Sequence, residues 1–210
     1  MSEREIREQI SAFGASLFER GLTAGSSGNI SVRLPDGLLV TPTNSCLGNL
    51  DPDRISKLSH SMELVSGDKP SKEAFLHHSM YRARENEGAI VHLHSTYSVA
   101  VSCLEGIDHD DVIPPITAYY VMRVGKLPLI PYFAPGDERL AEAVERASAN
   151  SRAVLLSNHG PVIAGKSLEA AVYAMEELEE TAKLFLTLRN ESIRPLTSEQ
   201  VSDLEQRFGK

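Results

Sequence analysis

The sequence predicts an α/β protein built on a mixed sheet. Helical and strand-like apolar patterns alternate along the chain, which is typical of this class. The turn signal Asp36-Gly37, between two apolar runs, predicts an antiparallel hairpin within the sheet. A third observation is the run Ile90-Val91-His92-Leu93-His94, whose branched apolar residues predict a buried strand.

Length and composition indicate one soluble domain. The chain has 210 residues, 41% hydrophobic and 24% charged, so we expect a single domain over residues 1–210. No apolar run reaches the roughly 20 residues of a membrane span. The N-terminus does not resemble a signal peptide, and Cys46 and Cys103 do not form a disulfide framework, so we expect a cytoplasmic protein. The net charge of −8 argues against nucleic-acid binding but not against a small anionic substrate.

The first half of the chain is expected to form one helix and several strands. Residues 3–20 show helical apolar spacing, and Gly21 ends that helix. Beyond the loop at 25–29, strands are expected at 30–34, 38–40 and near 62–65, with turns at 41–53. A helix is expected from Pro70-Ser71 to about Glu87.

The second half alternates more regularly. Strands are expected at 89–94 and 153–156, and helices at 95–104, 137–149 and 168–189. Residues 105–111 read as an acidic loop with an exposed His109. The stretch before residues 129–133 is ambiguous, and residues 193–210 contain no motif that we can interpret.

Two histidines on the predicted core strand indicate a metal site. Side chains at i and i+2 of a strand point to the same face, so His92 and His94 are aimed at one point. This arrangement suits a metal such as zinc. Two hydrogen-bonded core histidines would also explain the pair, so the pair alone leaves both interpretations open.

A third histidine and one acid extend this candidate site. His159 follows the buried strand 153–156 and would complete a set of three histidines, although a single such residue is more often part of a loop. Glu73 lies in the first turn of the helix expected after Pro70, where the helix dipole alone favours an acid. The functional alternative is a carboxylate that acts as a base or a fourth ligand. His77, one turn on, could orient Glu73, although a surface or core-edge position is favoured for His77 and His78.

The ordered set of motifs resembles the class II aldolase/adducin family, related to L-fuculose-phosphate aldolase. The matching stretches are Ser26-Ser27-Gly28-Asn29-Ile30-Ser31 with Arg33, Val40-Thr41-Pro42-Thr43, Pro70-Ser71-Lys72-Glu73 with His77, His92-Leu93-His94 and Asn158-His159-Gly160. They cover roughly residues 5 to 190. The resemblance implies a three-layer α/β/α fold with a mixed, largely antiparallel sheet. It also implies a homotetramer with active sites between subunits.

The resemblance assigns roles residue by residue. It implies that one Zn²⁺ per subunit is bound by His92, His94 and His159, and that Glu73 is the catalytic acid/base, which also contacts the resting metal. It implies binding of the substrate phosphate by Gly28, Asn29, Thr43 and Ser71, with Asn44 and Ser45 as possible additions. A tyrosine that reaches a neighbouring subunit's site matches Tyr119 or Tyr120, and Tyr119 is favoured.

Lys72 separates two branches of the family. Sugar-phosphate aldolases usually read Ser-Ser-Glu where this chain has Ser71-Lys72-Glu73, and the lysine would suit a second anionic group on the substrate. The sequence therefore most resembles the branch that decarboxylates 3-oxo-tetronate 4-phosphates. The expected products are dihydroxyacetone phosphate and CO₂, formed through a metal-stabilised ene-diolate. An ordinary solvent-exposed lysine remains the alternative.

Other activities on the same scaffold stay open. The nearest is a class II aldolase that cleaves a ketose 1-phosphate, because its chemistry needs the same metal and acid/base. An epimerase or dehydratase would lose no carbon. A non-catalytic module, as in adducin, is disfavoured because the chain retains His92, His94 and His159.

Overall fold

The computed structural model describes residues 1–134 and 137–208, and a single eight-stranded sheet organises them. The strands are β1 (Asn29–Leu34), β2 (Gly37–Val40), β3 (Ser56–Leu58), β4 (Leu64–Ser66), β5 (Ala89–His92), β6 (Leu129–Ile130), β7 (Ala153–Leu156) and β8 (Gly160–Gly165). Their order in the sheet is β4-β3-β2-β1-β5-β8-β7-β6. Only the β6–β7 pair is parallel among the pairs described, so the expected mixed, largely antiparallel sheet is confirmed.

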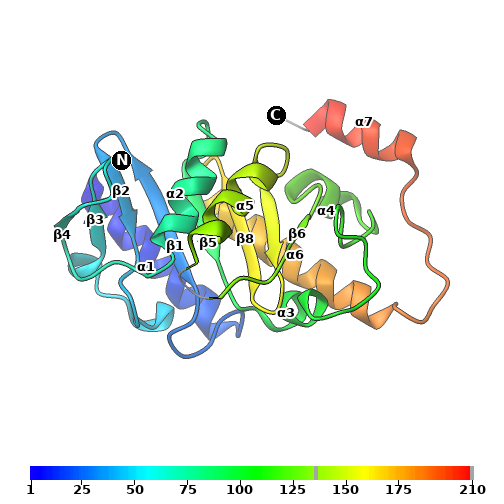
Figure 1. Cartoon of the computed structure of the whole chain (residues 1–210), viewed down its shortest axis with the longest axis horizontal. Helices are drawn as coiled ribbons and strands as arrows, with labels where there is room; N and C mark the ends of the chain where they lie inside the picture. The colour runs from blue at the N-terminus through cyan, green and yellow to red at the C-terminus, as the bar shows by residue number, and fades with distance from the viewer. Residues whose placement is uncertain (135–136, 209–210) are drawn as a thin grey trace.

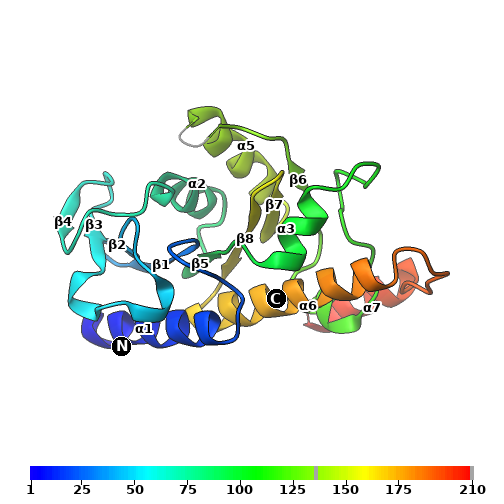
Figure 2. The same ribbon diagram turned by 90° about the horizontal axis from the view of Figure 1, so that it is seen from below.

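Helices cover both faces of this sheet. They are α1 (Glu3–Glu19), α2 (Ala74–Ala83), α3 (Thr96–Ser102), α4 (Ala118–Arg123), α5 (Glu138–Ser148), α6 (Leu168–Thr187) and α7 (Ser198–Phe208). Helices α1 and α6 run along one face, while α2 and α5 lie on the other (Figures 1 and 2). The α/β/α layering implied by the resemblance is therefore present.

Strand alternation divides the core between the two faces. Val91 and Leu93 join the larger apolar cluster with α1 and α6, whereas Ile90 joins the cluster with α2 and α5. Side chains alternate along a strand, so His92 and His94 share the α2 side with Ile90. The face beneath α2 and α5 is therefore the one on which a site can form.

Several helices and strands begin or end at residues other than those expected from the sequence. The helix expected from Pro70-Ser71 to about Glu87 begins only at Ala74 and ends at Ala83. At its start, the Ser71 N–H donates to the Thr41 carbonyl and an isolated bridge joins Pro42 to Pro70, so this segment is tied to the sheet instead. Strands β3 and β8, the 3₁₀ turns at Leu47–Asn49 and Pro52–Arg54, and helices α4 and α7 were not expected.

No helix in the described ranges is both long and apolar enough to cross a bilayer. The longest, α6, spans 20 residues but carries several glutamates along its length.

Candidate active site

Strand β5 delivers the first two histidines to one point. His92 is its last residue and is fully buried, and His94 follows two residues later with part of its ring exposed. Their Nε2 atoms lie 3.2 Å apart. The Nδ1 of His92 lies 2.8 Å from the Pro161 carbonyl, and that bond requires Nδ1 to be the donor. The Nε2 of His92 is thereby left as the lone-pair nitrogen that faces His94.

His159 reaches the pair from the turn between β7 and β8. Asn158 has a positive φ of 54°, which turns the chain sharply before His159. Gly160 then packs so closely on β5 that an added Cβ would lie 2.3 Å from the Leu93 carbonyl oxygen. Because of this close approach, the ring of His159 lies 4.9 Å from that of His92 and 4.6 Å from that of His94, centroid to centroid.

Glu73 completes the cluster from the start of α2. It occupies the N-cap position but makes no capping hydrogen bond, so the helix-end explanation for this acid does not account for its orientation. Its Oε1 lies 3.2 Å from His159 Nε2, and its Oε2 lies 3.4 Å from His92 Nε2. Asn29 Nδ2 donates to Oε2 at 2.7 Å and fixes the carboxylate.

These four side chains fit a divalent metal. One ligand atom from each of Glu73, His92, His94 and His159 can be chosen so that all lie within 4.8 Å of one another. Ligands bound tetrahedrally to zinc at about 2.0–2.1 Å are about 3.3–3.4 Å apart. The measured separations of 3.2, 3.2 and 3.4 Å match this spacing. Three imidazole nitrogens and one carboxylate oxygen are also a donor set that zinc accepts.

The protonation states agree with metal binding. Burial lowers the pKa of His92, and burial with the neighbouring imidazoles lowers the pKa of His94 to about 4, so both rings are neutral at pH 7. Burial opposes ionisation of Glu73. The adjacent His92 and the hydrogen bonds from His159 and Asn29 outweigh it, and they hold the pKa of Glu73 well below its usual range. His92 and His94 thus offer neutral nitrogens, and Glu73 offers an anionic oxygen.

A cavity of about 510 Å³ opens over this cluster. Its walls include every residue that the sequence assigned to the substrate, namely Gly28, Asn29, Thr43, Ser71 and Lys72, together with Asn44. Ser45 lies outside this lining, and its hydroxyl donates to the Pro42 carbonyl. The structure therefore brings the expected anion-binding residues and the histidine cluster to one cavity.

Gly28 and Asn29 contribute in different ways. Gly28 has a φ of +80°, and an added Cβ would lie 2.9 Å from the His92 carbonyl oxygen, so only glycine fits where this loop crosses the end of β5. The side chain of Asn29 is almost fully buried and donates to Glu73. Asn29 thus supports the acid, a contact that the sequence pattern did not predict.

The two candidate tyrosines differ in solvent exposure. Tyr120 is 2% exposed and belongs to the core, whereas Tyr119 is 59% exposed on the surface of α4. Helix α4 packs against α6 and α7, and Tyr119 is absent from the lining of the 510 Å³ cavity. Within one chain, the structure does not bring Tyr119 to the site.

Three aromatic residues in the cavity wall, Phe75 of α2 together with Tyr132 and Phe133, were not identified from the sequence as site residues. Tyr132 and Phe133 follow β6 and line the cavity beside Leu140 of α5. They belong to a short loop without periodicity, so no pattern marked them. Their position just beyond the short strand 129–130 is the one signal that could have done so.

His77 departs from the expected surface or core-edge position. It is fully buried, burial lowers its pKa to about 3, and its Nδ1 lies 2.7 Å from the Ser31 hydroxyl. No hydrogen bond joins it to Glu73 among the described residues, so Asn29 and not His77 orients the acid.

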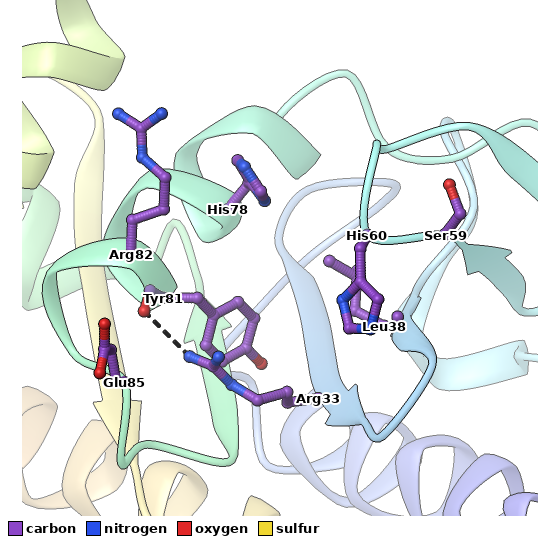
Figure 3. Close-up of a pocket in the computed structure, with 9 residues that line it drawn as sticks. Arg33, Leu38, Ser59, His60, His78, Tyr81, Arg82 and Glu85 are labelled. Carbon is purple, nitrogen blue, oxygen red and sulfur yellow. Dashed lines mark hydrogen bonds between the residues drawn. The ribbon is translucent and has the colours of Figure 1, made fainter.

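A second cavity of about 420 Å³ lies on the far side of α2 and contains none of the cluster residues. Figure 3 shows Arg33, His60 and His78 around it. The Arg33 guanidinium donates to the carbonyls of Tyr81, Arg84 and Glu87 and stacks over the Tyr81 ring. Arg33 therefore closes the C-terminal end of α2 and takes no part in the histidine cluster.

Comparison with known proteins places the chain in a family. The family described as Class II Aldolase and Adducin N-terminal domain matches residues 8–186. The 3-oxo-tetronate 4-phosphate decarboxylase of Pectobacterium atrosepticum is 54% identical, over 97% of this chain and 94% of that protein. The crystal structure of YgbL from Escherichia coli superimposes with a TM-score of 0.94 at 50% identity, covering 96% of this chain and 98% of that one. The L-fuculose phosphate aldolase of E. coli strain CFT073 is 31% identical, over 99% of this chain and 96% of that protein.

The fold and the site define a metal-dependent lyase that acts on carbon–carbon bonds. The chain belongs to the class II aldolase/adducin family, as its sequence motifs predicted.

Proposed function

We propose that this protein decarboxylates a 3-oxo-tetronate 4-phosphate to dihydroxyacetone phosphate and CO₂. The observation that carries the proposal is that one cavity is lined by Glu73, His94 and His159 of the metal-ligand cluster, by the loops expected to bind phosphate and by Lys72. The name of the 54% identical relative supports the same reaction.

The two anionic ends of such a substrate have matching partners. Lys72 is exposed to the cavity, and it forms no ion pair within residues 1–134 and 137–208. Its ammonium is therefore free to bind the C1 carboxylate. Gly28, Thr43 and Ser71 offer backbone N–H and hydroxyl groups for the phosphate on C4.

The reaction needs a group that stabilises the electron pair left on C2 and a group that supplies one proton. Breaking the C1–C2 bond releases CO₂ and leaves its electron pair on C2, conjugated with the C3 carbonyl. A divalent metal, when bound by His92, His94, His159 and Glu73, would supply the Lewis acidity that this step needs, and we propose zinc. A proton taken from solvent and passed to C2 through Glu73, or through Tyr119 of a neighbouring subunit, then gives dihydroxyacetone phosphate.

Asn29 and the cavity walls prepare Glu73 for this proton transfer. Asn29 keeps one carboxylate oxygen oriented through its 2.7 Å hydrogen bond. Phe133, Leu140 and Leu76 line the same cavity as Glu73 and give it an apolar wall. Positioning of this kind is the contribution of the chain itself to the reaction.

We propose that the active protein is a homotetramer in the cytoplasm, with sites between subunits. The exposure of Tyr119 and its absence from the site of its own chain support a role in a neighbour's site. The free cysteines Cys46 and Cys103 suit a reducing compartment.

The test is to incubate the purified protein with a phosphorylated 3-oxo-tetronate and to measure CO₂ and dihydroxyacetone phosphate together. The proposal expects equal amounts of the two products. Release of an aldehyde from a ketose 1-phosphate, without CO₂, would instead establish the aldolase alternative, which the 31% identical relative keeps in view.

A further inference from the structure

Helix α3 begins directly after the metal-site residue His94, and it lacks a cap of its own. Its N-cap residue is Ser95, whose side chain makes no capping hydrogen bond. The first amides of a helix have no partner within the helix and need one from elsewhere. For α3 that partner comes from a residue more than 80 positions further along the chain.

Glu179 of α6 provides the missing cap. Its Oε1 accepts from the Tyr97 N–H at 2.7 Å, and its Oε2 accepts from the Ser98 N–H at 2.8 Å and from the Ser98 hydroxyl at 2.6 Å. These are the second and third helical residues, the positions that a cap normally serves. Glu179 is only 7% exposed, and no cation forms an ion pair with it in the described part of the chain. The hydrogen-bond partners of its carboxylate therefore all belong to the first turn of α3.

Helix α6 contacts the first turn of α3 through a second residue. Lys183, one turn beyond Glu179, lies with its Nζ 5.6 Å from the centre of the Tyr97 ring. Helix α3 also packs against α6, and it lies above α6 in Figure 2. The start of α3 is therefore held against α6 by Glu179 and Lys183.

This anchoring matters because the two histidines are held differently. His92 lies within β5, paired with both neighbouring strands, and its ring is bonded to Pro161. His94 lies beyond the end of β5, in the three-residue connection from His92 to Thr96. One end of that connection is the sheet, and the other is the helix start that Glu179 caps.

We propose that Glu179 is a positioning residue for His94, acting through the first turn of α3. The inference rests on the proposed metal site, because it assigns Glu179 a role in metal affinity. Removing the carboxylate should loosen the corner at residues 95–98 and let His94 move, while His92 and His159 remain in place. Loss of a group that orients a ligand typically lowers metal affinity by about 10- to 100-fold.

The experiment compares zinc affinity, measured by competition with a chromophoric chelator, in wild type, Glu179→Gln and Glu180→Gln. Glu180 is the matched control, since it is the next residue on α6 and is exposed, and its side chain makes no hydrogen bond within the described ranges. We expect about a 10- to 100-fold loss of affinity in Glu179→Gln only. Hydrogen exchange should be faster at Tyr97 and Ser98 in the same variant.

A purely structural cap gives a different result. It would lower the melting temperature of Glu179→Gln and leave zinc affinity at the wild-type value, which would overturn the proposal. If Glu179→Gln does not fold, Ser98→Ala removes one of the three bonds and should show a smaller loss of affinity; no loss there would equally overturn it. A wild type that binds no zinc would refute the metal site itself, which is a distinguishable outcome.

Discussion

Replacing Gly160 by alanine should disassemble the metal site without touching any ligand. An alanine Cβ at this position would lie 2.3 Å from the Leu93 carbonyl oxygen, whereas ordinary contacts begin at 3.4 Å. The β7–β8 turn must therefore move away from β5 by roughly 1 Å, well beyond the roughly 0.2 Å tolerance of metal–ligand distances. His159, the preceding residue, would move with it and leave His92 and His94 behind.

Two magnitudes follow from this displacement. Overpacking of this kind costs about 1–3 kcal/mol of folding stability, and each kcal/mol lowers Tm by about 2–4 °C for a chain of this size. Zinc affinity should fall by at least the roughly 10- to 100-fold that ligand misplacement costs. Chelator competition measures the affinity, and thermal unfolding of the metal-free protein measures the stability.

Gly21→Ala is the control for stability alone. Gly21 has a φ of +75°, so alanine there is strained by about 1 kcal/mol, but an added Cβ meets no atom within 4 Å. Both variants should lose stability, and only Gly160→Ala should lose zinc. Wild-type zinc affinity in Gly160→Ala would refute the argument that the Gly160–Leu93 contact sets the position of His159.

Three further predictions concern the reaction. Glu73→Gln should retain zinc and lose about 10²- to 10⁴-fold in kcat, and a near-normal rate would remove Glu73 from acid/base chemistry. Lys72→Ala should raise KM for the phosphorylated acid sugar about tenfold or more, because a charge-assisted hydrogen bond contributes about 1.5–3 kcal/mol. Lys69→Ala is its control, because Lys69 is exposed but does not line the cavity. Equal KM values in the two variants would argue against a contact between Lys72 and the substrate carboxylate. Tyr119→Phe and Glu73→Gln, each poorly active alone, should regain part of the activity after subunit exchange, and a mixture that stays inactive would contradict a site shared between subunits.

The sequence predicted the parts of the site that depend on local patterns. The strand expected at 89–94 ends at His92, but the prediction that His92 and His94 converge on one point is confirmed by their 3.2 Å Nε2–Nε2 distance. The positions of His159 and Glu73 follow from contacts between distant segments, and only the ordered family motifs linked them in advance. The supporting bonds from Asn29 and Glu179 join residues more than 40 positions apart, and no spacing rule could indicate them.

Some elements of the fold carried misleading signals. Strand β8 begins with Gly160 and Pro161, two residues that argue against a strand. Pro161 still contributes hydrogen bonds to the sheet, because its carbonyl accepts from the His92 ring and from the Leu93 N–H. The start of α2 was expected too early because Pro70 and Ser71 resemble a helix start, although here they pair with the sheet.

The central claim is that one metal ion, bound by His92, His94 and His159 with Glu73, makes this chain a carbon–carbon lyase. Its most direct test is to titrate metal-free protein with zinc while measuring bound metal and CO₂ release from a phosphorylated 3-oxo-tetronate. We expect activity to rise in step with zinc binding and to saturate at about one ion per chain, as in zinc enzymes with three protein histidines. Full turnover by the metal-free protein, or saturation with zinc and no release of CO₂, would contradict it.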